Sequence, residues 1–272
     1  DPTDDVNAPR TATGAVPASA AAPPTVPRTG LMPGRSDVRY GFSTRAHGTT
    51  SDTVGRGDPV AARRALVAEI GHPDAPVALM RQVHGRTVAT VGQDVGVDTA
   101  PDMRPEADGL VTTRPATALG VFVADCVPVL LSAGRAVGAV HAGRGGVALD
   151  VVGEAIEALL ADGHASADQV TAVIGPAIGP CCYEVPADMA TDVVEATGLP
   201  NARARTSWGT PSLDLPGAVG DQLRARGVTR INRAGGCTRC EADTWFSHRA
   251  TTMDATTFPA GRQIGVIVRE DA

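Results

Sequence analysis

Two histidines and one cysteine, His84, Cys126 and His141, carry the chemistry that the sequence suggests. They stand in the segments RQVHG, ADCVP and VHAGRGG, beside small residues and close to short apolar runs. A Ser-Ala-Gly turn separates the runs that carry Cys126 and His141, and adjacent strands joined in this way can bring two side chains together. Two imidazoles and one thiolate suit Zn²⁺, and a fourth position left for water would make such a site catalytic.

The same residues have a second interpretation. Cys126 can be a small packed hydrophobe, and the two histidines can cap turns. No close-spaced ligand pair such as HExxH decides between the two interpretations. Asp125, next to Cys126, can likewise orient a ligand histidine or satisfy the amides of a turn.

The four remaining cysteines form two pairs, for which we favour a structural role. Cys237 and Cys240 make a CxxC with no second CxxC, so a zinc ribbon is not supported. Cys181 and Cys182 are neighbours in the chain, and two adjacent cysteines rarely ligate one metal without strain.

Charge and cysteine usage narrow the class of protein. A net charge of −6 and a pI near 5.5 argue against a nucleic-acid-binding surface. All 24 basic residues are arginine, so any anion must be met by arginine, backbone N–H groups or metal. Five cysteines without a secretory signal predict a cytoplasmic protein with reduced thiols. The most apolar stretch, 119–141, is broken by Asp125, Pro128 and Arg135 and predicts no membrane span.

Apolar periodicity predicts an α/β fold with one domain, a mixed β-sheet and flanking helices. Residues 1–35, rich in Ala, Pro and Thr, are expected to be a disordered N-terminal leader, and residues 36–272 a single catalytic domain. Helices are expected at 58–71, 147–163, 187–197 and 215–226. Strands are expected at 38–44, 77–82, 87–91, 110–113, 119–124, 127–131, 137–140, 170–174, 228–232 and 263–268. No GxGxxG or GxxxxGK[ST] follows any of these strands, which argues against dinucleotide and P-loop sites.

Taken together, these segments resemble the laccase-domain or polyphenol-oxidase family, also called the YfiH/YlmD family. The matching pieces run in the family's order over about residues 38–270. They are FSTR (42–45), QVHG (82–85), ADG (107–109), ADCVPVLL (124–131), VHAG (140–143), IGPAIGPCCYEV (174–185), FSHR (246–249) and GR (261–262).

The resemblance implies a single-domain α/β protein with a YfiH-like layered fold. It implies that His84, Cys126 and His141 bind one zinc ion, with copper as the alternative metal. The activity it implies is phosphorolysis of adenosine, inosine, guanosine and methylthioadenosine, together with deamination of adenosine. Purine nucleosides and phosphate are then the expected partners. Cys126, His141 and Asp125 are the expected catalytic residues.

Phosphorolysis needs an anion site, for which arginines are the candidates. The family usually has a Trp-Arg pair after VHAG, where this chain has Arg144-Gly145, and the loop after FSTR is shorter here than usual. The phosphate is therefore expected at Arg45, with Arg144 or Arg249 assisting. Each of these arginines can instead make an ordinary ion pair.

Three other functions use the same residues. Copper-dependent oxidation of phenols follows the family's older name, but multicopper chemistry needs more histidines than the six present. A cysteine hydrolase that edits cell-wall precursors would use Cys126 as nucleophile and His141 as base, without metal. A binding module without catalysis is the third. The sequence leaves the preferred nucleoside and the oligomeric state open.

Overall fold

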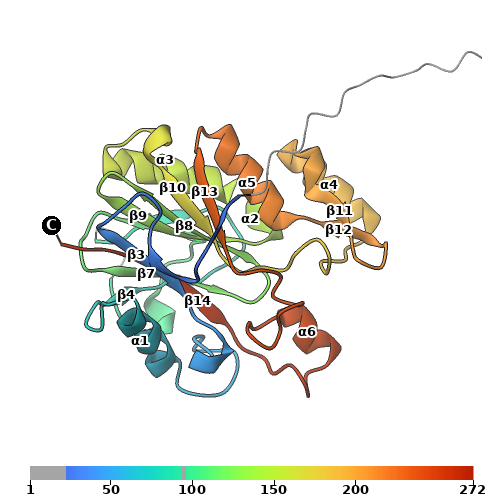
Figure 1. Ribbon diagram of the computed structural model, residues 1–272, viewed down its shortest axis with the longest axis horizontal. Helices are drawn as coiled ribbons and strands as arrows, with labels where there is room; N and C mark the ends of the chain where they lie inside the picture. Colours follow the sequence, from blue (N-terminus) through green and yellow to red (C-terminus); the bar gives the residue numbers. More distant parts are fainter. Residues whose placement is uncertain (1–22, 93–95, 272) are drawn as a thin grey trace, which may run out of the picture.

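The computed structural model describes residues 23–92 and 96–271, within which the strands form two large sheets and a two-stranded ribbon (Figure 1). The seven-stranded sheet has the order β1 (Thr25–Val26), β13 (Arg230–Ala234), β10 (Thr171–Ile174), β8 (Val127–Ala133), β9 (Ala136–Ala142), β6 (Gly109–Thr112) and β5 (Val88–Thr90). The five-stranded sheet has the order β2 (Thr29–Leu31), β3 (Val38–Phe42), β14 (Gln263–Arg269), β7 (Ala118–Val123) and β4 (Val77–Ala78). The ribbon pairs β11 (Arg203–Arg205) with β12 (Pro211–Leu213).

Both large sheets contain parallel and antiparallel neighbours. In the first, β8 pairs antiparallel with β9, whereas β10 pairs parallel with β13. In the second, β14 runs antiparallel to β3 and β7, and β4 runs parallel to β7. The predicted mixed α/β architecture is therefore confirmed.

The α-helices of the described residues are α1 (Pro59–Glu69), α2 (Arg144–Ala148), α3 (Val151–Gly163), α4 (Ala187–Thr197), α5 (Leu215–Ala225) and α6 (His248–Met253). Short 3₁₀ turns are η1 (Arg45–His47), η2 (Pro101–Met103), η3 (Ala167–Gln169) and η4 (Pro200–Ala202). The helix expected over 147–163 is divided, because Asp150 adopts a left-handed φ of 57° and accepts a hydrogen bond from Gly153 N as the N-cap of α3. The prediction of one continuous helix there was wrong.

The core has layers because strand side chains alternate between faces. On β8, Val127, Val129 and Leu131 pack with the apolar residues of α3 and α5, whereas Leu130 lies in the cluster between the two sheets. Tyr40, on β3 of the second sheet, belongs to that same inter-sheet cluster. The outer face of the second sheet packs against α1. Figure 1 accordingly shows α3 and α5 beyond one sheet and α1 beyond the other.

Described residues before 36, where the single domain was expected to begin, already pair with the two large sheets. Residues 1–22 lie outside the described residues, but β1 pairs with β13 and β2 pairs with β3. Met32 is only 1% exposed. Backbone hydrogen bonds add such short edge strands without the apolar periodicity that the prediction relied on.

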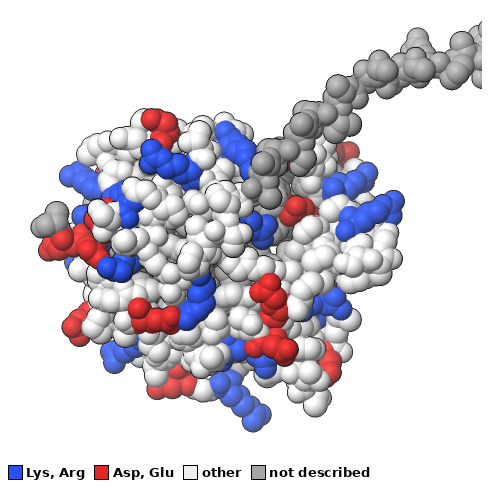
Figure 2. Space-filling view, viewed as in Figure 1, with Lys and Arg blue, Asp and Glu red and all other residues white. Residues whose placement is uncertain are grey.

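On the face seen in Figure 2, arginines and carboxylates are interspersed over the surface. Among the described residues, no helix has the length and apolar character needed to cross a bilayer.

Candidate active site

Backbone pairing brings Cys126 and His141 together. Cys126 directly precedes β8, and His141 lies near the end of β9, opposite Pro128 in the antiparallel register. His84 reaches the same place from the turn after β4, where it adopts a left-handed φ of 59°. Its Nε2 lies 3.9 Å from Cys126 Sγ, and its ring meets that of His141 edge-on at a centroid distance of 4.8 Å.

The three side chains fit a zinc ion. Their donor atoms all lie within 4.8 Å of one another. Bond lengths of about 2.0–2.3 Å to nitrogen and sulfur imply donor separations of roughly 3.3–3.8 Å in a tetrahedral site, so small side-chain movements suffice. His84 is exposed, Cys126 is half-buried and His141 is buried, so the set is open to a pocket on one side. An open set of three ligands is typical of a catalytic metal site.

Asp108 positions two of the three candidate ligands, His84 and His141. Its carboxylate is fully buried and accepts hydrogen bonds from the backbone N–H groups of His84 at 3.0 Å and Gly85 at 2.7 Å. It also accepts one from His141 Nδ1 at 2.8 Å. That bond leaves His141 Nε2 as the ligand atom. Burial raises the pKa of Asp108, but the hydrogen bonds from His141 and Gly85 outweigh it and hold that pKa below its ordinary value.

Cys126 and His141 form a charged pair when no metal is bound. Burial opposes the thiolate, yet hydrogen bonds with His141 and His84 lower the pKa of Cys126 to about 6. Burial likewise lowers the pKa of His141, but hydrogen bonds with Asp108 and Cys126 raise it to about 9. The sulfur is therefore held as a thiolate near neutral pH, the form in which cysteine binds metal or attacks an electrophile.

A pocket of about 450 Å³ opens above the three ligands. Phe122, Met80 and Val123 give it an apolar wall. Arg262 and His248 lie on its polar side. Such a volume, with a few convergent polar groups, is in the usual range for small-molecule sites.

Gln82 ties the QVHG segment to the wall of this pocket. Its side-chain amide donates to the carbonyl of Phe122 at 2.8 Å and accepts from the N–H of Phe122 at 2.8 Å. The amide thus makes the pair of hydrogen bonds that a neighbouring strand would make with Phe122. The strand predicted over 77–82 ends at Ala78, and these bonds hold the segment before His84 in its place.

Asp125 was predicted as a residue that could orient a ligand histidine, but its hydrogen-bond partners are other residues. It has a left-handed φ of 91°. Its carboxylate accepts from Thr238 Oγ1 at 2.6 Å and from the backbone N–H of Arg249 at 2.7 Å. Asp108, not Asp125, makes the carboxylate contact with a ligand histidine. The ADG segment was the only signal for it in the sequence, and that segment also reads as an ordinary turn.

The three predicted phosphate-binding arginines lie outside the lining of this pocket. Arg45 donates to the carbonyl of Ala242 and lines a separate depression. Arg249 lies over the ring of Tyr183, with its Cζ 5.5 Å from the centroid, and the charge of Arg144 opposes the rise that burial causes in the pKa of the same tyrosine.

Arg262, which the sequence interpretation did not single out, lines the pocket instead. Burial lowers the pKa of its guanidinium, while the charges of Cys126 and Asp125 act in the opposite direction. Among the described residues, no carboxylate lies within ion-pair distance of it. Within the described part of the chain, its side chain donates one hydrogen bond, to the carbonyl of Gly261 at 3.0 Å, which leaves other donors available.

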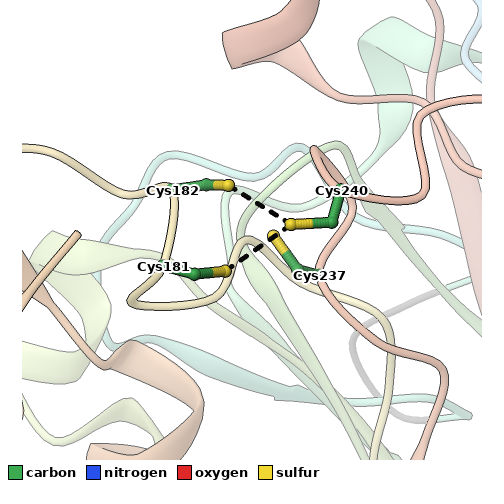
Figure 3. A group of neighbouring side chains, drawn as sticks. All are labelled: Cys181, Cys182, Cys237 and Cys240. Carbon is green, nitrogen blue, oxygen red and sulfur yellow. Dashed lines mark hydrogen bonds between the residues drawn. The ribbon is translucent and has the colours of Figure 1, made fainter. Parts of the chain in front are cut away.

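The remaining four cysteines, expected to act as two separate structural pairs, gather in one cluster away from this pocket. Their sulfurs all lie within 4.8 Å of one another, and the side chains of Cys181 and Cys182 point toward those of Cys237 and Cys240 (Figure 3).

Known proteins are similar to this chain over most of its length. The family model described as multi-copper polyphenol oxidoreductase laccase matches residues 39–270. A purine nucleoside phosphorylase of Mycobacterium tuberculosis is 44% identical over 86% of this chain and 92% of its own. A purine nucleoside phosphorylase of Streptomyces griseus is 39% identical over 86% of this chain and 96% of its own.

Solved structures agree. YlmD from Geobacillus stearothermophilus superposes with a TM-score of 0.75 at 31% identity, covering 87% of this chain and 93% of that one. The hypothetical protein YfiH of Bacillus licheniformis gives a TM-score of 0.77 at 26% identity, covering 90% of this chain and 97% of that one. The chain therefore belongs to the laccase-domain family of enzymes, the family of YfiH and YlmD, and the relatives it matches are named purine nucleoside phosphorylases.

Proposed function

We propose that the protein is a zinc-dependent purine nucleoside phosphorylase that also deaminates adenosine. Its substrates are adenosine, inosine, guanosine and methylthioadenosine. The observation that carries the proposal is the open set of His84, Cys126 and His141 at the base of a pocket of about 450 Å³. The names of the similar relatives support the substrate class. We assign the activity to the cytoplasm, on the support of the cysteines of the described residues, which form no disulfide.

The residues that would hold the metal are His84, Cys126 and His141. A zinc ion held there would supply Lewis acidity and the means to activate water near neutral pH, which suits deamination at C6 of adenosine. Asp108 keeps the His141 ring in one orientation and one tautomer, because its carboxylate accepts the Nδ1 proton. The same carboxylate fixes the backbone of His84 and Gly85.

In phosphorolysis, a phosphate oxygen bonds to C1′ of the nucleoside as the bond from C1′ to the base nitrogen breaks. The base leaves with that electron pair and takes up a proton, and ribose 1-phosphate is the other product. Phosphate brings two negative charges into the pocket, and a planar guanidinium binds it with paired, charge-assisted hydrogen bonds. We assign this role to Arg262, because it lines the pocket and has no carboxylate partner among the described residues.

The base is assigned to the apolar wall. Phe122 offers a purine ring a flat, apolar surface in the same pocket as Arg262. Deamination consumes water and releases ammonia from C6 without using phosphate. The two reactions therefore share the base site and differ in whether they need the arginine.

For each of two other functions, one specific observation counts in favour. The low pKa of Cys126, about 6, beside His141 favours a cysteine hydrolase that acts on cell-wall precursors. The family's description favours copper-dependent oxidation of phenols. Metal content separates them from the proposal, since the hydrolase needs no metal and the oxidase needs copper.

The test is chromatography of adenosine, inosine and phosphate after incubation with purified protein of known metal content. Hypoxanthine or adenine together with ribose 1-phosphate, formed by zinc-loaded protein and lost on chelation, is the expected result. His84→Ala is the matched inactive control, because it removes one ligand from an exposed turn. Nucleoside turnover that survives complete removal of metal would contradict the zinc requirement. Chelator-resistant oxygen uptake with phenols after copper loading would favour the oxidase.

A further inference from the structure

Two loops that follow neighbouring parallel strands carry the four-cysteine cluster of Cys181, Cys182, Cys237 and Cys240. β10 and β13 pair in parallel register, with Ile174 opposite Arg233, so the chain leaves both strands at the same edge of the sheet. The pairing continues beyond the strands as a bridge between Ala177 and Cys237. Cys181 and Cys182 therefore approach Cys237 and Cys240 through the sheet topology.

The sulfur positions match a tetrahedral thiolate site. Cys240 Sγ lies 3.4 Å from Cys182 Sγ and 3.7 Å from Cys181 Sγ, and all four sulfurs lie within 4.8 Å of one another (Figure 3). These distances far exceed a disulfide bond of about 2.05 Å. Metal–sulfur bonds of about 2.3 Å at tetrahedral angles separate the sulfurs by roughly 3.8 Å.

Adjacent cysteines rarely ligate one metal, but the turn after Gly179 allows Cys181 and Cys182 to do so. The N–H groups of Cys182 and Tyr183 both donate to the carbonyl of Gly179 at 3.0 Å, which winds the chain tightly after Gly-Pro. In this turn both sulfurs point to the same side, toward Cys237 and Cys240 (Figure 3).

Hydrogen-bond donors surround the sulfurs, as thiolates require. Gly179 N donates to Cys237 Sγ at 3.2 Å, and Arg239 Nη1 donates to Cys182 Sγ at 3.4 Å. The guanidinium of Arg239 also stacks on Trp208, with its Cζ 5.1 Å from the ring centroid. Four thiolates around a divalent cation carry an excess of two negative charges, and Arg239 offsets part of it.

We propose that Cys181, Cys182, Cys237 and Cys240 bind a second zinc ion, distinct from the one assigned to the pocket. A set of four thiolates closes the coordination sphere, so this zinc has a structural role. The CxxC loop carries Thr238, whose hydroxyl donates to Asp125 at 2.6 Å, directly before Cys126. The second zinc thus stabilises the turn that holds Cys126 beside the pocket.

The test is metal analysis of the full-length protein purified from zinc-supplemented medium. Two zinc ions per chain are expected in the unmodified protein. Cys240→Ser should leave one, Cys126→Ala should leave one, and the double variant should leave none. One zinc per chain that Cys240→Ser does not lower overturns the proposal, whether or not the pocket binds metal. Iron in place of zinc would overturn the choice of metal.

Cobalt substitution gives a readout that does not depend on the stability of Cys240→Ser. In Cys126→Ala, only the cluster remains to bind Co²⁺. The expected spectrum is that of a tetrahedral tetrathiolate, with intense sulfur-to-cobalt charge-transfer bands and one cobalt per chain. Absence of these bands overturns the proposal. So does a thiol count in denatured, unreduced protein that falls below five by two or four, because it would mean that the cluster forms disulfides.

Discussion

The carboxylate of Asp108 accepts a 2.8 Å hydrogen bond from Nδ1 of His141, and both side chains are buried. His141 lies on β9 and Asp108 directly precedes β6, its antiparallel neighbour, and His141 N also donates to the carbonyl of Asp108 at 2.7 Å. Asp108 and His141 are thus joined by one backbone hydrogen bond and one side-chain hydrogen bond. The pairing of β9 with β6 therefore fixes the orientation of the His141 ring.

Asp108→Asn should lower zinc affinity at the pocket by about 10- to 100-fold and reduce both nucleoside reactions. A neutral amide holds the Nδ1 proton of His141 less well, and it cannot satisfy the backbone N–H groups of Val83, His84 and Gly85 as the carboxylate does. Competition with a chelator measures the affinity. Asp214→Asn, at the N-cap of α5, is the matched control, since asparagine caps helices equally well. Unchanged zinc affinity in Asp108→Asn would show that His141 is oriented by its packing alone.

Gly143→Ala should block the metal site without harming the fold. A Cβ added at Gly143 would lie 2.8 Å from His84 Cδ2 and 3.2 Å from Cys126 Sγ. The backbone there is extended, with φ −76°, so alanine adds no backbone strain. The variant should bind zinc at least tenfold more weakly at the pocket while its unfolding midpoint in urea stays close to that of the parent.

The comparison for Gly143→Ala is Gly198→Ala. Gly198 has a positive φ of 67° and open space around its Cβ position, so alanine there strains the backbone and leaves the metal site untouched. The two variants should therefore have opposite profiles of stability and metal binding. Full zinc affinity in Gly143→Ala would contradict the ligand geometry described above.

The sequence predicted elements well where the signals are local. Asp58 and Pro59 mark the start of α1, and the N-cap contacts of Asp58 with Val60 and Ala61 bear this out. The break between α2 and α3 escaped prediction, because residues 147–163 form a continuous apolar pattern. Its cause is tertiary: Arg226 of the loop after α5 bonds the carboxylate of Asp150 at 2.5 Å, beside the start of α3.

The proximity of His84, Cys126 and His141 was predictable in part, because a short turn joins the strands next to Cys126 and His141. Asp108 was not predictable, because an acidic residue before glycine is common in turns. The cysteine cluster was not recognisable either. Cys181 and Cys240 are 59 residues apart, and only the adjacency of β10 and β13 brings them together.

Asp52 joins two arginines at the rim of the pocket, and its loss should destabilise the fold. Its carboxylate pairs with Arg63 at 3.1 Å and with Arg104 at 2.7 Å, and its side chain is 18% exposed. Removing a charged acceptor of this kind costs about 1.5–3 kcal/mol. Asp52→Asn should lower the free energy of unfolding by that amount at pH 7, as measured by urea denaturation.

The difference in free energy of unfolding between the parent and Asp52→Asn should depend on pH. Burial raises the pKa of Asp52, but hydrogen bonds from Arg63 and Arg104 outweigh it and lower that pKa in the folded state. A lowered pKa stabilises the protein above the unfolded value of about 3.9, and the contribution is lost as the pH falls through the folded value. The stability gap between parent and Asp52→Asn should therefore be constant above about pH 5 and shrink in acid. A gap that widens in acid would contradict this account.

Arg262→Ala should separate the two nucleoside reactions. Phosphorolysis needs the dianion beside C1′, whereas deamination needs only water at C6, so loss of the guanidinium should raise the apparent KM for phosphate at least tenfold, or about 1.4 kcal/mol. Conversion of adenosine to inosine should persist at a similar rate. Steady-state assays with adenosine at varied phosphate measure both reactions in one sample. Arg45→Ala is the paired variant, because Arg45 lines a separate depression and donates to the carbonyl of Ala242. If Arg45→Ala raises the KM for phosphate and Arg262→Ala does not, the anion binds outside the pocket and the assignment of Arg262 is wrong.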